Sequence, residues 1–205
     1  LAPVPGRAIG LLTAVALLLM LASTRNVNWD EFLFLSHVLA HNHDWLDQSF
    51  QTAFVHAFGW LGLVPGHEMD QIFLARLVMT ALFATTLVSL HRLAREMADP
   101  VSADIAVVAF ICSGFVLAHG TSFRADPIAA AGLMGSLAIM MTGRMSPWQI
   151  AAVSILSAAA LLVTVKAVLY LPAYLAALAW RWADRQAVIR SLLAGVIGLG
   201  LAGAL

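Results

Sequence analysis

Long apolar runs, separated by short charged or Pro/Gly-containing stretches, dominate the pattern of this chain. A helix needs about 20 apolar residues to cross the hydrocarbon core of a bilayer. Runs near this length, several of them shorter, predict seven membrane-spanning helices. They cover residues 8–24, 71–90, 103–118, 127–142, 148–165, 167–180 and 191–205. We therefore expect an all-α fold, a polytopic transmembrane helical bundle that forms a single domain over residues 1–205.

The charges between these runs predict the orientation. If the spans alternate in direction, seven basic residues fall on one side: Arg7, Arg92, Arg95, Arg144, Arg181, Arg185 and Arg190. The other side holds four: Arg25, Arg76, Arg124 and Lys166. Basic residues favour the cytoplasmic side, so the amino terminus is expected in the cytoplasm of a bacterial-type inner membrane. Seven of the 11 acidic residues fall on the outer side: Asp30, Glu31, Asp44, Asp47, Glu68, Asp70 and Asp126.

The longest connection, residues 25–70, is expected outside the cytoplasm and contains two apolar stripes at helical spacing. The first stripe follows Asp30 and consists of Phe32, Leu35 and Leu39. The second consists of Phe50, Phe54, Ala57, Phe58 and Leu61. We expect two amphipathic helices that lie at the membrane interface, anchored by Trp29, Trp45 and Trp60.

Composition agrees with a membrane location. Hydrophobic residues make up 61% and charged residues 11% of the chain, whereas a soluble domain has roughly 45–50% and about 25%. Membrane lipid is therefore an expected partner. The formal net charge is zero and there is no basic tract, so nucleic acid is not expected as a partner. Cys112 is the only cysteine, which excludes a disulfide within the chain.

Asp30 and Glu31 are adjacent carboxylates immediately beyond the first span. Such a pair can accept a proton from a substrate or bind a divalent cation. The alternative is local: Asp30 caps the helix that follows, and Glu31 lies in its first turn.

Two further groups lie near the outer ends of spans. Asp126 before Pro127 is typical of a helix start, whereas the neighbouring Arg124 could bind phosphate or pair with a carboxylate. Lys166 separates two apolar runs, so it either reaches the interface or provides a positive charge for a lipid-linked phosphate. Four neighbouring residues could be metal ligands: His37, His41, His43 and Asp44. The His-Glu-x-x-His motif of zinc peptidases is absent, however.

The order of these motifs resembles the GT-C superfamily, polytopic glycosyltransferases that use polyprenyl-phosphate sugars, such as the protein mannosyltransferase and aminoarabinose transferase types. The resemblance begins with Asp30-Glu31 and the loop behind it, and continues through Ala75-Arg76-Leu77 and Leu90-His91-Arg92-Leu93-Ala94-Arg95. It ends with Arg124-Ala125-Asp126-Pro127 and with Thr164-Val165-Lys166 followed by Pro172.

The resemblance implies a role for each matched residue. Asp30 would be the general base or the carboxylate that orients the acceptor nucleophile, supported by Glu31 either directly or through a divalent cation. Asp126 would be a second acidic residue at the mouth of the site. Arg124 and Lys166 would bind the donor phosphate. The implied function is transfer of a sugar from a polyprenyl-phosphate donor to an acceptor on the extracytoplasmic face.

Two other functions compete with this one. A catalytically silent relative would be a structural subunit that binds other membrane subunits, since small residues such as 129–132 and 195–203 favour close helix packing. A transporter would use Asp126 and Lys166 as substrate sites, but these charges lie near span ends and no repeated half is visible.

Overall fold

The computed structural model describes residues 5–45 and 52–204, and within these ranges the chain is helical, with turns and without strands. The expected positions of Asp47 and Phe50 lie outside the described residues. The helices run in the order α1 (Pro5–Thr24), α2 (Trp29–Asn42), α3 (Thr52–Phe58), η1 (Gly59–Leu63), α4 (Glu68–Met97), α5 (Pro100–Ile111), α6 (Gly114–His119), α7 (Ala125–Thr142), α8 (Pro147–Val163), η2 (Val165–Tyr170), α9 (Leu171–Trp180) and α10 (Arg185–Ala204).

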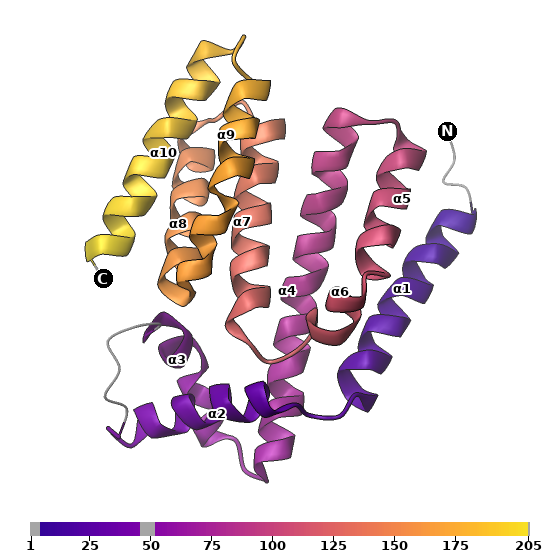
Figure 1. Ribbon diagram of the computed structural model, residues 1–205, viewed down its shortest axis with the longest axis vertical. Coiled ribbons are helices and arrows are strands. Elements are labelled where there is room, and N and C mark those ends of the chain that lie inside the picture. The colour runs from indigo at the N-terminus through magenta and orange to yellow at the C-terminus, as the bar shows by residue number, and fades with distance from the viewer. Residues whose placement is uncertain (1–4, 46–51, 205) are drawn as a thin grey trace.

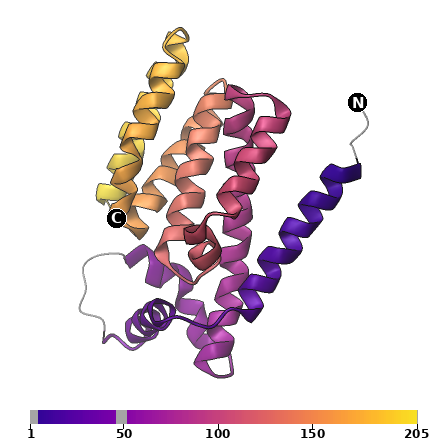
Figure 2. The ribbon, with the colours of Figure 1, turned by 45° about the vertical axis from the view of Figure 1, so that its right-hand side comes forward.

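The long helices run up and down as an antiparallel bundle, and α2 and α3 lie across one end of it (Figure 1). The connections α6–α7 and α8–η2 lie at the same end as α2. The turns α4–α5, α7–α8 and α9–α10 lie at the opposite end. Helix α1 meets α4 near its own C-terminal end and diverges from the bundle toward its N-terminus (Figures 1 and 2). Successive long helices therefore run in opposite directions, as was assumed when the charged residues were assigned to the two ends of the bundle.

Three helices of the described part are long and apolar enough to cross a membrane: Glu68–Met97, Ala125–Thr142 and Arg185–Ala204. Two of the other expected spans, 103–118 and 148–165, correspond to shorter helices, because local signals end them. Ser113 ends the run after α5 by capping a separate helix, α6. Thr164 accepts a hydrogen bond from the Lys166 amide and separates α8 from the 3-10 turn η2. Residues 5–45 and 52–204 are thus helical with three candidate spans, and seven spans stay a prediction.

Capping explains where several helices begin. Asp99 accepts hydrogen bonds from the amides of Val101 and Ser102, at 2.9 and 3.2 Å, so α5 starts at Pro100. Ser146 and Gln149 form a capping box before Pro147, which opens α8.

The apolar stripes of the 25–70 loop pack partly against the protein itself, and the place of their helices at the membrane interface stays a prediction. Leu35, Phe54, Phe58 and Leu61 are almost completely buried, in one core with residues of α4 and with Phe123. The rings of Phe54 and Phe58 lie 5.2 and 5.0 Å from that of Phe123. The stripes are used to attach α2 and α3 to the bundle, because burial against protein removes as much apolar surface from water as burial in lipid would. Trp29 and Trp45 remain exposed.

Small residues allow close packing among α7, α8 and α10. A Cβ atom added to Gly132 would lie 2.9 Å from the Leu156 carbonyl, and one added to Gly198 would lie 3.0 Å from that of Ser154. The Ser154 hydroxyl donates across the helix interface to the Ala194 carbonyl at 2.9 Å. This packing brings η2 and the start of α7 to the same end of the bundle as α2.

Candidate functional site

Four charged residues form a continuous chain of ion pairs at the α2 end of the bundle. Asp30 Oδ2 lies 3.0 Å from Arg124 Nη1, and Arg124 Nη2 lies 3.4 Å from Asp126 Oδ2. Asp126 Oδ1 in turn lies 3.3 Å from Lys166 Nζ. The structure thus brings together four of the five site residues predicted from the sequence, from α2, α7 and η2. We call these four residues the ion-pair cluster.

The local sequence places the two acidic members differently from the capping prediction. Asn28, not Asp30, caps α2: its side chain accepts from the Glu31 amide at 3.0 Å, and Glu31 Oε2 accepts from the Asn28 amide. Asp30 is therefore in the first turn and is free to meet Arg124. Likewise Arg124 occupies the N-cap position of α7, so Asp126 and Pro127 lie inside its first turn rather than at its cap and first position.

The cluster is least exposed at Arg124 and more open at both of its ends, Asp30 and Lys166. The Arg124 side chain is 16% exposed, those of Asp126 and Asp30 are 31% and 43% exposed, and that of Lys166 is 63% exposed. Within the described part of the chain, the buried Nε of Arg124 has no hydrogen-bond acceptor. An anionic group arriving from solvent would thus meet Lys166 first and Arg124 deeper in the cluster.

Glu31, the fifth predicted residue, points away from this cluster into the protein interior. Its side chain is completely buried, and its Oε1 accepts from Arg76 Nε at 2.8 Å and from the Phe123 amide at 2.9 Å. Oε2 accepts from Arg76 Nη2 at 2.6 Å and from the Asn28 amide at 3.1 Å. Burial by itself would raise the pKa of Glu31, but these hydrogen bonds outweigh it and hold the pKa below its ordinary value.

The hydrogen bonds of Glu31 favour a structural role over the predicted catalytic or metal-binding role. Both of its oxygens already accept two hydrogen bonds, and a carboxylate has about four acceptor positions. No position is left for a substrate or a cation. Glu31 is instead a positioning residue, since it fixes the start of α2 and, through Phe123, the segment that carries Arg124.

Arg76 is a residue of this site to which the sequence alone assigned no role. Besides Glu31, its guanidinium donates to the carbonyls of Ala22, Arg25 and Asn26 at 3.1, 2.7 and 3.1 Å. It therefore ties the end of α1 and the start of α2 to α4. In the sequence, Arg76 could be recognised by its position within an apolar run, because a buried charge there must be paired with another polar group.

Arg25 and His119 border the cluster. Arg25 donates to Ser122 Oγ and to the Ala118 carbonyl, and lies 3.9 Å from Glu31 Oε1. His119 Nδ1 lies 3.3 Å from Arg124 Nη1, and because a guanidinium only donates, Nδ1 must accept. Burial, followed by the charge of Arg124, lowers the pKa of His119, which agrees with a neutral ring.

Neither predicted metal arrangement assembles in the described ranges. Residues 5–45 and 52–204 contain no group of three or more His, Cys, Asp or Glu side chains that could hold a metal ion. Asp30 is directed to Arg124, and of the histidine group, His41 Nε2 lies 3.2 Å from Nδ1 of His56.

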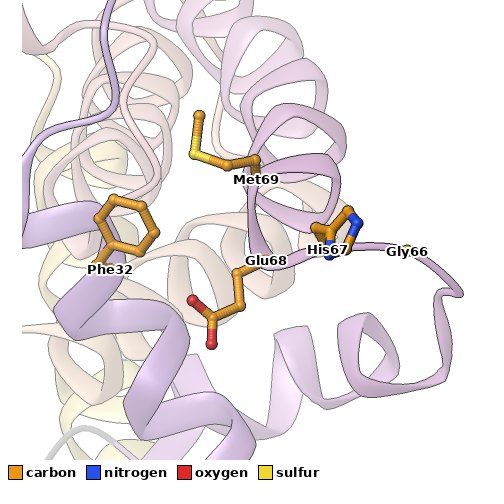
Figure 3. A pocket seen from close by; sticks show the side chains of 5 residues that line it. All are labelled: Phe32, Gly66, His67, Glu68 and Met69. Atoms are coloured by element: carbon orange, nitrogen blue, oxygen red, sulfur yellow. The ribbon is translucent and has the colours of Figure 1, made fainter.

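An open hollow of about 480 Å³ lies beside α2, at the start of α4. It is lined by Phe32, Gly66, His67, Glu68 and Met69, and Figure 3 shows Phe32 and Glu68 reaching into it from the two different helices. No member of the ion-pair cluster lines it. The ion-pair cluster is therefore separate from the residues that line this hollow.

No protein-family model matches this chain, and no curated protein and no solved structure matches it either.

Proposed function

We propose that this protein is a membrane glycosyltransferase of the GT-C type. It moves a sugar from a polyprenyl-phosphate donor to an acceptor on the extracytoplasmic face of a bacterial-type inner membrane. The N-terminus lies in the cytoplasm, so that the α2 end of the bundle faces outward. The observation that supports this function is the ion-pair cluster, in which a carboxylate and two cations from distant parts of the sequence meet at one end of apolar helices.

In the proposed reaction Asp30 takes the proton of the acceptor hydroxyl while the acceptor oxygen bonds to the anomeric carbon of the sugar. The bond between that carbon and the phosphate oxygen breaks, and its electron pair leaves with the phosphate. Arg124 and Lys166 neutralise the charge that develops on the phosphate, a type of stabilisation that acts strongly where water is partly excluded. Asp126 lies between the two cations and holds them in place.

A direct test is the release of polyprenyl phosphate from a panel of polyprenyl-phosphate sugars by the purified full-length protein. Asp30→Asn should lower turnover about 100-fold or more, the typical contribution of a general base. Glu68→Gln is the matched control, because Glu68 is an exposed carboxylate near the same end of the bundle but outside the cluster. Unchanged turnover in Asp30→Asn would exclude Asp30 as the base.

The second candidate is a catalytically silent structural subunit of a larger membrane complex. It is favoured by α10, whose Gly195, Gly200 and Gly203 have open space where a Cβ would be. Small residues on an uncovered helix face permit close approach of another membrane helix. Stoichiometric co-purification with a membrane partner, together with no polyprenyl phosphate release from any donor, would favour this candidate over the enzyme.

A further inference from the structure

Two arginines tie together the α7–α8 and α9–α10 turns, at the end of the bundle opposite the ion-pair cluster (Figure 1). Arg181 donates to the carbonyls of Met140, at 2.7 Å, and Gly143, and pairs with Asp184 at 2.8 Å. Arg190 Nη1 lies 3.4 Å from the carbonyls of Arg144 and Met145. The two turns are therefore neighbours, held in one arrangement by side chains.

This arrangement concentrates positive charge. Arg144 in the first turn and Arg185 at the start of α10 are both exposed, beside Arg181 and Arg190. Asp184 is the one acidic residue within residues 140–190, and it is already paired with Arg181. Within residues 140–190, Arg144 and Arg185 thus remain as exposed guanidinium groups with no further acidic residue to pair with them.

Exposed indole rings surround these two arginines in the sequence and the fold. Trp148 lies in the first turn of α8, Trp180 ends α9 and Trp182 lies in the turn before α10. Their exposed fractions are 72%, 59% and 72%. Next along α10, Ile189 and Leu192 are also exposed. Tryptophan is enriched where membrane meets water, with its ring at the level of the lipid headgroups.

We propose that this end of the protein is a binding surface for an anionic phospholipid of the phosphatidylglycerol type. We call it the arginine–tryptophan surface, formed by Arg144, Arg185, Trp148, Trp180 and Trp182. Guanidinium groups bind the phosphodiester oxygens through charge-assisted hydrogen bonds. The indoles lie at the depth of the glycerol region, and the acyl chains run along the apolar face of α10. This proposal needs only membrane placement of the apolar helices and is independent of glycosyl transfer.

The test is native mass spectrometry of the full chain in detergent, titrated with phosphatidylglycerol or with phosphatidylcholine. We expect phosphatidylglycerol to bind more tightly. Arg144→Gln/Arg185→Gln should weaken that binding by about fivefold for each arginine, the effect of one basic residue near an anionic lipid surface. The matched control is Arg92→Gln/Arg95→Gln, which removes two exposed arginines from the same end but from α4. It should leave the preference nearly unchanged.

Three results would overturn the proposal. Equal affinity for the two lipids would show that charge does not select the headgroup. An equal loss in both double variants would show a diffuse charge effect in place of a site. Displacement of the lipid by glycerol phosphate at equal concentration would show that the surface recognises a free phosphate group and not a lipid. Thermal unfolding of the two double variants and the native chain checks that all three are compared in the folded state.

Discussion

Arg76 of α4 binds both carboxylate oxygens of Glu31 in α2, at 2.8 and 2.6 Å, and neither side chain is exposed. This pair lies directly beneath the ion-pair cluster, since Glu31 follows Asp30 and also accepts from the Phe123 amide next to Arg124. The geometry of the surface charges therefore depends on a buried charge pair whose hydrogen bonds are all made.

Removing one member of this pair should destabilise the fold strongly. Arg76→Met leaves the Glu31 carboxylate buried without its main partner, which costs about 3–5 kcal/mol. Glu31→Gln/Arg76→Met should be less destabilised than the sum of the two single variants, because the pair is coupled. Unfolding in mixed detergent micelles measures both effects. Lys166→Met, at an exposed position, is the control and should change stability by no more than about 0.5 kcal/mol. A cost for Arg76→Met as small as that of the control would contradict this role.

Acid should remove the stabilisation that Glu31 provides. Its pKa in the folded protein is below the ordinary value of 4.5, despite burial, because Arg76 and two amides bind the charged form. The unfolded state therefore binds the proton more readily, so this stability is complete above about pH 4.5 and is lost as the pH falls through the folded-state pKa. The measurement is the unfolding midpoint from pH 7 to pH 3 in the native chain and in Glu31→Gln. The difference between the two should shrink with acid, and a difference that grows would show the opposite sign.

The two cations of the cluster should differ in importance for the proposed transfer. Arg124 is nearly buried and contacts both Asp30 and Asp126, whereas Lys166 is 63% exposed and contacts Asp126 alone. Arg124→Gln should lower kcat about 100- to 1,000-fold, as loss of a preorganised donor does. Lys166→Gln should cost about tenfold, because a mobile charge in solvent stabilises less. Arg124→Lys should give an intermediate value, since it keeps the charge without the planar fork. The same polyprenyl phosphate release assay provides the comparison, and the reverse order would be evidence against the assigned roles.

The proposed orientation can be tested with single cysteines in a Cys112→Ala background. Glu68→Cys lies at the start of α4, on the α2 end of the bundle, and Ala98→Cys follows the other end of α4. Both positions are exposed. In intact cells a membrane-impermeant maleimide should label Glu68→Cys and leave Ala98→Cys unlabelled until the cells are opened. The reverse pattern would place the ion-pair cluster in the cytoplasm and rule out transfer on the outer face.

The sequence placed the four residues of the ion-pair cluster at one end of the bundle, but it did not predict the ends of the helices around them as well. The assignment of Asp30, Arg124, Asp126 and Lys166 to one side follows from counting apolar runs, which is a strong and repeated signal. The alternation alone could not reveal that Arg124 contacts Asp30, because that contact depends on how α7 packs against the layer of α2 and α3.

The sequence was ambiguous where two nearby residues, or two environments, suited the same local pattern. Asn28 and Asp30 are both good capping residues, and Asn28 caps α2 because Glu31 then completes the capping box. The apolar stripe of Phe54 and Phe58 suits a membrane interface and a protein core equally well, so only the tertiary structure decides between them. Arg76 could be recognised as needing a partner, but not that the partner is Glu31, 45 residues earlier.

The hydrogen bonds of Glu31 also impose an order on synthesis and assembly. When α2 has left the ribosome, Asn28 is the only one of the hydrogen-bond partners of Glu31 named above that is already present, because Arg76 follows 45 residues later and Phe123 92 residues later. A nascent chain that carries α2 but not yet α4 therefore holds a carboxylate whose charge must stay in water. The layer of α2 and α3 can dock only after α4 has emerged, and it becomes fixed when the segment before α7 arrives. Folding of this end of the protein thus depends on the translation of residues far downstream.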